Sequence, residues 1–222
     1  MDINIYNFTN EWVDSIVDKI KVCAYNAIKE HGIFNIVFSG GNTPILIFQR
    51  LTLMNLEWNK WHFWLSDERI LVNSTSFLNK YLIYKNLLNK INYEKNQIHF
   101  LIDNLSLNDS IIFYENELKK VLFFDLVLLG IGEDGHTASL FPGNNLGLEQ
   151  NSPNVLGINN SPKAPSNRIS LSTNRLNKSY NLYFLVKGPE KKNIIDKIIK
   201  GQSFPCTNIS GLNETKIYYC TN

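Results

Sequence analysis

The sequence has little of what builds disulfide-rich, zinc-binding or membrane proteins. Its 222 residues include only three cysteines, Cys23, Cys206 and Cys220, at wide and odd spacing and without a Cys-x-x-Cys motif. This pattern predicts reduced thiols and a cytoplasmic location rather than a disulfide framework. No pairing of cysteines or histidines has zinc-site spacing, so we expect no metal. No apolar run approaches the 18 or so residues of a membrane helix, and the acidic N-terminal region is unlike a secretory signal.

The sequence also lacks an excess of charge of either sign. Its 22 Lys and Arg against 20 Asp and Glu give a net charge of +2, without a basic block. Neither a nucleic-acid partner nor a membrane surface is therefore expected. No internal repeat and no linker rich in glycine, proline or serine divides the chain. With 44% hydrophobic residues, the length suits one domain over residues 1–222.

Short apolar runs alternate with helical periodicity along most of the chain. Strands are predicted at 4–6, 36–38, 61–65, 97–101, 126–129, 155–158, 167–172, 182–186 and 217–219. Helices are predicted at 11–29, from 45, at 79–91, 110–122 and 189–200, with Thr9 or Asn10 as a cap of the first. This alternation predicts an α/β fold with a single doubly wound, mostly parallel, Rossmann-like sheet and helices on both faces.

The most informative stretch follows the apolar run at 126–129. Gly130, Gly132 and Gly135 lead to His136, with Glu133 and Asp134 between them. The glycine spacing also fits a dinucleotide fingerprint, but that motif normally lies in the first strand–helix unit and carries no charge where a pyrophosphate approaches. We interpret the stretch as a catalytic loop, because histidine can transfer a proton near neutral pH. The alternative is an ordinary turn with solvated acids.

A second signal follows the strand at 36–38. Gly40 and Gly41 precede Asn42, Thr43 and Pro44 at the start of a helical pattern. Free backbone N–H groups at such a junction can bind an anion. A well-capped helix after a tight turn is the plainer interpretation. The loop lacks the Lys-Ser/Thr ending of a nucleoside triphosphate site.

Charged residues lie in or directly after three further predicted strands. Asp67 and Arg69 follow the strand at 61–65 and share one face of an extended chain, Arg168 lies in the strand at 167–172, and Lys187 ends the strand at 182–186. Each could be a solvated surface charge. In open α/β sheets, however, ligands bind at the carboxyl ends of the strands, where these residues are expected to meet.

Together these motifs resemble the 6-phosphogluconolactonase family. The resemblance rests on Ser39–Pro44, Asp67–Arg69, Gly130–Gly143, Arg168–Ser172 and Lys187-Gly188, in family order over nearly the whole chain. The related glucosamine-6-phosphate deaminases share the glycine loop and an Asp-Gly-His, but differ after the histidine and at Arg69. The chain departs from the family pattern at Asn42, Leu71-Val72 and Leu78, and it lacks an acid after the last strand.

The resemblance implies hydrolysis of 6-phospho-D-glucono-1,5-lactone, the second step of the oxidative pentose phosphate pathway. It implies that His136 is the general base, that Asp134 or Glu133 orients it, and that Asp67 and Arg69 bind sugar hydroxyls or the oxyanion. The implied phosphate-binding residues are Gly40, Gly41, Asn42, Thr43, Arg168 and Lys187. It implies no metal or organic cofactor, a functional link to glucose-6-phosphate dehydrogenase, and a monomer. Ser39 and Ser139 lack the setting of a nucleophilic serine.

Two other functions stay open at this point. One is deamination or isomerisation of an amino sugar phosphate, which would release ammonia. The other is a sugar-phosphate-binding subunit or sensor without turnover, since a fold and a glycine loop do not by themselves require catalysis.

Overall fold

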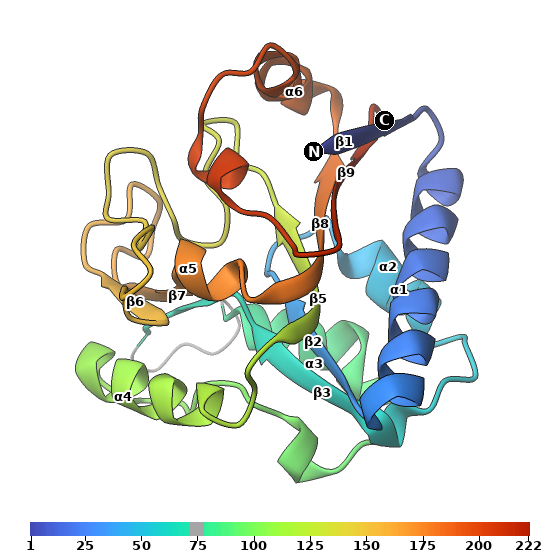
Figure 1. Ribbon diagram of the computed structural model, residues 1–222, viewed down its shortest axis with the longest axis horizontal. Helices are drawn as coiled ribbons and strands as arrows, with labels where there is room; N and C mark the ends of the chain where they lie inside the picture. The colour runs from blue at the N-terminus through green and yellow to red at the C-terminus, as the bar shows by residue number, and fades with distance from the viewer. Residues whose placement is uncertain (72–77) are drawn as a thin grey trace.

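The computed structural model describes residues 1–71 and 78–222, and its centre is a six-stranded parallel sheet (Figure 1). The strand order is β1-β9-β8-β5-β2-β3. The strands are β1 (Asp2–Tyr6), β2 (Phe34–Phe38), β3 (Trp61–Leu65), β5 (Phe124–Gly130), β8 (Ser179–Lys187) and β9 (Glu214–Cys220). The predicted α/β class is confirmed.

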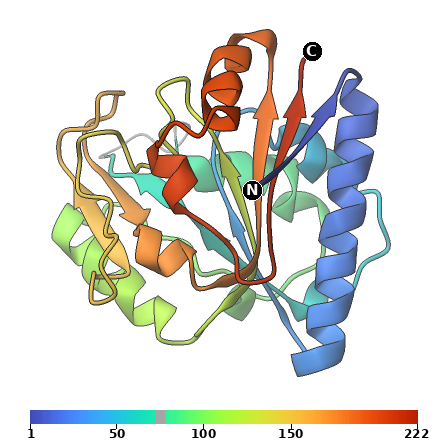
Figure 2. The same ribbon diagram turned by 45° about the horizontal axis from the view of Figure 1, so that its top comes forward.

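Helices cover both faces of this sheet, as its buried strands require (Figures 1 and 2). One face packs against α1 (Thr9–His31), α2 (Ile45–Leu51) and α3 (Asn79–Asn86), and the other against α4 (Leu107–Leu118), α5 (Thr173–Leu176) and α6 (Lys192–Ile199). Successive strand side chains point to opposite faces. In β5, Leu126 and Leu128 therefore belong to the first core, whereas Val127 and Leu129 belong to the second.

A small antiparallel sheet, which the sequence did not predict, lies beside the second core. It consists of β4 (Asp67–Arg69), β7 (Arg168–Leu171) and β6 (Val155–Ile158), in the order β4-β7-β6. Its register pairs Asp67 with Ser170 and Arg69 with Arg168. Two segments about a hundred residues apart in the sequence are thereby brought side by side next to the carboxyl end of β3.

Several predicted boundaries were wrong. Among the described residues, the predicted strand at 97–101 forms a single isolated bridge, between Ile98 and Phe63. The predicted helix at 79–91 stops at Asn86, because Leu87 leaves helical geometry with φ −132° and ψ −68°. The N-cap of α1 is Phe8, without a side-chain hydrogen bond, so neither Thr9 nor Asn10 caps it. Short 3-10 helices occupy Trp58–Lys60, Leu88–Lys90, Lys95–Gln97, Pro189–Lys191 and Pro205–Asn208.

The strand order reverses between β2 and β5. From β2 the chain moves outward to β3, whereas β5, β8 and β9 are added successively on the other side. At such a switch point the connections leave a crevice at the carboxyl ends of the strands, where ligands bind in α/β folds. Figure 2 shows the ends of these strands pointing toward one side of the molecule.

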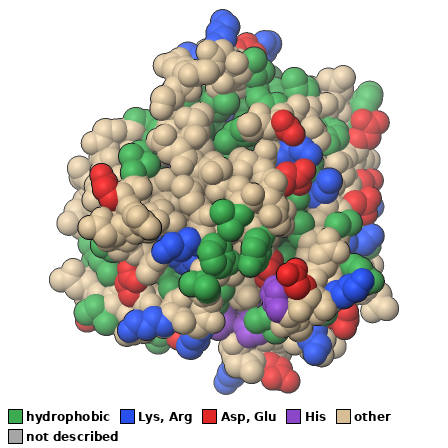
Figure 3. Space-filling view, viewed as in Figure 1, with side chains coloured by type: hydrophobic (Ala, Val, Ile, Leu, Met, Phe, Trp, Pro, Cys, Tyr) green, Lys and Arg blue, Asp and Glu red, His purple; other side chains and the backbone are tan. Residues whose placement is uncertain are grey.

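Figure 3 shows acidic and basic side chains interspersed over the face it presents. Among the helices of the described ranges, none is long and apolar enough to cross a bilayer.

Candidate active site

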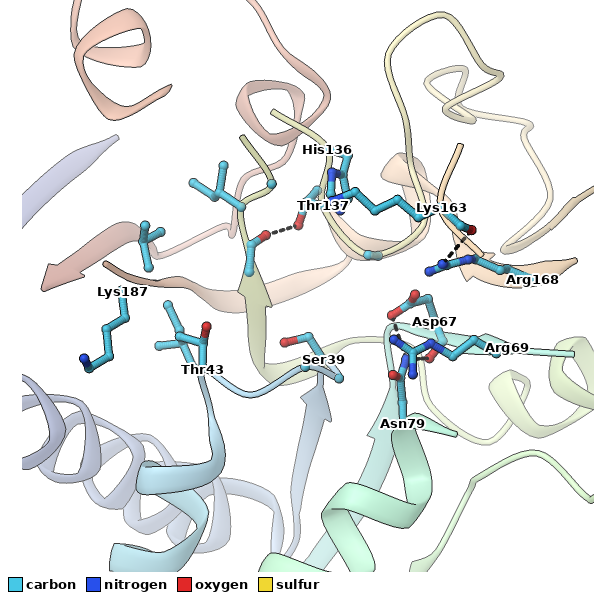
Figure 4. A pocket seen from close by; sticks show the side chains of 18 of the residues that line it. Ser39, Thr43, Asp67, Arg69, Asn79, His136, Thr137, Lys163, Arg168 and Lys187 are labelled. Atoms are coloured by element: carbon cyan, nitrogen blue, oxygen red, sulfur yellow. Dashed lines mark hydrogen bonds between the residues drawn. The ribbon is translucent and has the colours of Figure 1, made fainter. Parts of the chain in front are cut away.

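A cavity of about 320 Å³ opens at the carboxyl ends of β2, β3, β5 and β8 (Figure 4). Eight of the eleven residues expected at the site line it: Gly40, Gly41, Thr43, Asp67, Arg69, His136, Arg168 and Lys187. Asn42, Glu133 and Asp134 do not line the cavity. The cavity therefore gathers residues from five separate segments of the chain.

His136 lies in the turn that follows β5, with its side chain 16% exposed. Its Nδ1 contacts Asp134 Oδ1 at hydrogen-bond distance, and its backbone N–H donates to the same oxygen at 3.2 Å. The turn is closed by a hydrogen bond from Gly132 N to His136 O, at 2.8 Å, and the ring stacks on Phe141 with centroids 4.7 Å apart. Of the two acids considered, Asp134 is thus the one on the imidazole, while Glu133 is exposed.

The electrostatic environment suits a histidine that is neutral at pH 7. Burial lowers the pKa of His136, and the nearby ammonium group of Lys163 lowers it further, against the opposing effect of Asp134. For Asp134, burial acts to raise the pKa, but the hydrogen bond and charge of His136 outweigh it, so the pKa is lowered. Because Asp134 is ionised and accepts a hydrogen bond from Nδ1–H, the neutral imidazole has its lone pair on Nε2.

The buried carboxylate of Asp67 forms hydrogen bonds to side chains from three parts of the chain. Its Oδ2 accepts a hydrogen bond of 2.6 Å from Ser139 Oγ, and its Oδ1 accepts from Ser66 Oγ at 3.1 Å and from Asn79 Nδ2 at 3.3 Å. Asp67 is 6% exposed, and Ser139 is fully buried. Ser139 is therefore a partner of Asp67, which argues against its use as a nucleophile.

Glu68 lies in β4 between Asp67 and Arg69, and its side chain binds backbone N–H groups at the start of α3. Its carboxylate accepts from the backbone N–H groups of Arg69, Asn79 and Lys80 at 2.8 to 2.9 Å. Burial nevertheless raises the pKa of Glu68 to about 7, because these hydrogen bonds compensate only in part for lost hydration. The sequence identified Asp67 and Arg69 but gave no signal for this function of Glu68.

In the loop after β2, glycine is needed at position 41 for its backbone conformation and at position 40 for lack of space. Gly41 has φ +86°, a conformation that side chains disfavour. At Gly40, a Cβ would lie 1.8 Å from Asn79 Oδ1, so the glycine leaves room for Asn79. Asn79 lines the cavity and is 2% exposed. Pro44 precedes rather than begins α2, and Asn42 is exposed, with its carbonyl oxygen accepting from Ile45 N.

Arg168 reaches the cavity from β7, but much of its hydrogen-bonding capacity is used within the protein. Its Nε donates to Pro165 O at 3.1 Å, and its Nη2 donates to Lys163 O at 3.0 Å and Ala164 O at 3.1 Å. Burial lowers the pKa of Arg168, although a guanidinium remains charged at any physiological pH. Arg168 thus fixes a loop as well as facing the cavity.

The cavity lining also includes residues that were not predicted as site residues, among them Asn79, Lys163 and Lys191. Lys163 lies in a polar segment with two prolines, and Lys191 follows the Lys187-Gly188-Pro189 motif. Neither lysine belongs to a motif with a spacing of its own. Only the position of Lys191 one turn after Lys187 could have suggested it. Lys187 Nζ itself donates to the carbonyl oxygen of Asn222.

Metal ligands and thiols are not gathered at this cavity. Within residues 1–71 and 78–222, no three His, Cys, Asp or Glu side chains are arranged to hold a metal ion. Cys23, Cys206 and Cys220 are all buried free thiols. Of the departures noted in the sequence, Leu78 is buried and precedes α3, whereas Val72 lies outside the described residues.

The fold and this cavity define an α/β protein with an enzyme-type site: an oriented imidazole and buried carboxylates face several cations in one cavity. The sequence model "Glucosamine-6-phosphate isomerases/6-phosphogluconolactonase" matches residues 8–218. The chain belongs to this family of enzymes.

Individual relatives agree with this assignment. A 6-phosphogluconolactonase of Thermotoga maritima is 30% identical over 95% of this chain and 95% of its own. The crystal structure of 6-phosphogluconolactonase from Thermotoga maritima superposes with a TM-score of 0.89 at 26% identity, covering 100% of this chain and 99% of that one. A human GDH/6PGL endoplasmic bifunctional protein is 32% identical over 84% of this chain, which matches only 25% of that protein.

Proposed function

We propose that this protein hydrolyses 6-phospho-D-glucono-1,5-lactone to 6-phospho-D-gluconate, the second step of the oxidative pentose phosphate pathway. The observation that carries the proposal is the His136–Asp134 pair beside a cavity that also contains cations for a phosphate. The full-length similarity to the 6-phosphogluconolactonase of Thermotoga maritima supports the choice of substrate.

The phosphate end of the substrate fits the side of the cavity formed by the glycine loop and β8. Backbone N–H groups of Gly40 and Gly41 and the hydroxyl of Thr43 would donate to phosphate oxygens, with Lys187 and Lys191 supplying positive charge. Asn42 would contribute its backbone N–H, because its exposed side chain is not part of the lining. The phosphate contact expected of Arg168 stays a prediction, because Arg168 lies across the cavity from Thr43 and Lys187 (Figure 4) and its Nε and Nη2 already donate to loop carbonyls, which leaves Nη1 for a ligand.

His136 would act as the general base. With Nδ1 engaged by Asp134, its Nε2 removes a proton from water as the water oxygen attacks C1 of the lactone. The C1–ring oxygen bond then breaks, and the imidazolium returns the proton to the leaving ring oxygen. Such proton transfer contributes about 10²–10⁴-fold to a rate. Asp134 orients the ring and stabilises its charged form, whereas exposed Glu133 contributes at most through its field.

Asp67 and Arg69 would organise the opposite wall of the cavity. Asp67 is already bonded to Ser139, Ser66 and Asn79, so its main contribution is to hold these segments in place. Arg69 lies beside Asp67 in the cavity lining, where its guanidinium group could donate to sugar hydroxyls or to the oxyanion (Figure 4).

The expected surroundings of the enzyme are part of the same proposal. Fusion of a related segment in the human GDH/6PGL bifunctional protein supports a functional link to glucose-6-phosphate dehydrogenase. The monomeric state, the single domain over residues 1–222, the independence from a metal or organic cofactor, and the cytoplasmic location stay predictions from the sequence.

The test is an assay of lactone hydrolysis against the spontaneous rate, with lactone made fresh from glucose 6-phosphate. The wild type should accelerate hydrolysis, and His136→Ala should lose about 10²–10⁴-fold in kcat while still binding 6-phosphogluconate. His62→Ala is the matched control, because His62 lies outside the cavity and bonds to His99.

The outcomes separate the alternatives. An unchanged rate in His136→Ala would reject the mechanism but keep the reaction. A wild type that leaves the lactone at its spontaneous rate would reject the reaction. Ammonia release from glucosamine 6-phosphate would then identify a deaminase, and binding without turnover would identify a sensor.

A further inference from the structure

The loop at residues 161–167, between β6 and β7, is closed by its own hydrogen bonds. Ser161 N donates to Ser166 O at 3.1 Å. The hydroxyl of Ser161 donates to Lys163 O at 2.8 Å and accepts from Lys163 N at 3.2 Å. The backbone at Lys163 is therefore fixed on both its N–H and its C=O sides.

Arg168 joins this loop to the small sheet. Its guanidinium donates to three consecutive carbonyl oxygens, those of Lys163, Ala164 and Pro165, at 3.0 to 3.1 Å. Arg168 is 6% exposed, and its Cζ lies 5.8 Å from the ring centroid of Phe141. Phe141 also stacks on the imidazole of His136. The ring of Phe141 therefore lies in contact with both Arg168, which binds the loop, and His136, the proposed base.

The side chain of Lys163 extends from this anchored backbone over the cavity. Lys163 lines the cavity, and Figure 4 shows its side chain running from the side of Arg168 toward His136. Its positive charge acts on His136, lowering the pKa of the imidazole. Lys163 has no carboxylate partner among the salt bridges of the described residues, and it is exposed to solvent. A cation is thus held near the base and apart from the lysines at the phosphate end.

The proposed reaction places negative charge at two ends of the sugar. The phosphate is anionic throughout, whereas the oxygen on C1 becomes anionic only as water attacks and remains so in the carboxylate product. Thr43, Lys187 and Lys191 lie at the phosphate end. The atom attacked by water activated at His136 must be C1, so a cation beside His136 faces the C1 oxygens.

We propose that Lys163 is a substrate-binding residue that pairs with the C1 oxygens, first as the oxyanion of the tetrahedral intermediate and then as the product carboxylate. This inference rests on the proposed lactone hydrolysis. Lys163 stabilises charge that is absent from the lactone itself, so it lowers the barrier more than it strengthens substrate binding. It also disfavours the imidazolium form of His136 before water is activated.

Two ligands that differ only at C1 test this pairing. Both 6-phosphogluconate and glucitol 6-phosphate carry the same phosphate, but C1 is a carboxylate in the first and an uncharged alcohol in the second. Calorimetric titration of wild type and Lys163→Gln should show 6-phosphogluconate binding weakened about fivefold to tenfold. Binding of glucitol 6-phosphate should change by less than about twofold. Lys119→Ala, which removes an exposed lysine at the C-cap of α4, is the control for net charge.

The pH profile supplies a second readout. Because Lys163 lowers the pKa of His136, Lys163→Gln should move the acidic limb of kcat/KM to higher pH, and kcat should fall more than KM rises. Lys163→Arg, which keeps the charge, should recover part of both effects.

Each other outcome overturns the proposal. If Lys163→Gln bound both ligands equally more weakly than the wild type, Lys163 would contact the phosphate. If it bound both as tightly as the wild type, Lys163 would contact neither end of the ligand. The titrations require no turnover, so they judge Lys163 separately from the reaction. A wild type without lactonase activity would reject the proposed function, whatever the titrations show for the charge at C1.

Discussion

Gly132 lies against the imidazole of His136 so closely that no side chain fits there. A Cβ at residue 132 would be 1.9 Å from His136 Nδ1 and 2.6 Å from Asp134 Oδ1. Gly132 also donates its N–H to His136 O at 2.8 Å. The glycine is required at this position because the histidine and its carboxylate partner occupy the space of a side chain. The pattern that resembles a dinucleotide fingerprint therefore provides room for an acid–base pair.

Gly132→Ala should displace the imidazole and lower kcat by about tenfold or more, because the histidine loses its hydrogen bond to Asp134 and a hydrogen bond to a charged group contributes roughly 1.5–3 kcal/mol. NMR titration of the His136 ring is the direct measurement. Gly130→Ala is the matched control for the ring, since a Cβ there meets no atom within 4 Å. An unaltered His136 titration in Gly132→Ala would contradict this prediction.

Asp134→Asn should shift and depress the pH profile. The carboxylate raises the pKa of His136 against the effect of burial, so its removal should move the acidic limb of kcat/KM to lower pH. The maximum should fall about 10- to 100-fold, because an amide does not stabilise the imidazolium. Glu133→Gln is the control, since Glu133 is exposed. A larger loss in Glu133→Gln would show that the wrong acid has been assigned.

Ser139→Ala should destabilise the fold. It leaves Asp67 Oδ2 without its 2.6 Å partner in a buried site, and an unsatisfied buried acceptor costs about 1–3 kcal/mol. Urea unfolding at pH 7 measures this difference, with Ser203→Ala, at an exposed position, as control. If Ser139 were the nucleophile, the variant would instead be inactive at full stability.

Glu68→Gln should remove part of the pH dependence of stability. The pKa of Glu68 is about 7 in the folded protein and near the ordinary value of 4.5 when unfolded. The folded state therefore binds more protons between these values, so the contribution of Glu68 is greatest below pH 4.5 and is lost as pH rises through about 7. Urea unfolding of the wild type and the variant at pH 5 and pH 8 tests this. The drop in unfolding free energy toward pH 8 should be smaller in Glu68→Gln, and an equal drop would contradict the prediction.

The sequence by itself determined the α/β class and identified eight residues that line the cavity. Apolar runs and helical periods are local properties, so β5 and α1 could be located from them. Glycines followed by His136 mark a turn after a buried strand, and parallel strands end at a common edge. For this reason the residues after β2, β3, β5 and β8 could be expected to meet there.

Only the tertiary structure decided which side chains contact one another. The choice of Asp134 over Glu133 depends on turn geometry, because two adjacent acids carry the same local signal. Asp67 with Ser139 and Gly40 with Asn79 are contacts between separate segments, which no periodicity encodes. The small sheet depends on antiparallel pairing of β4 with β7, whose partners lie about a hundred residues apart. Lys163 enters the cavity only because that sheet and Arg168 hold its loop there.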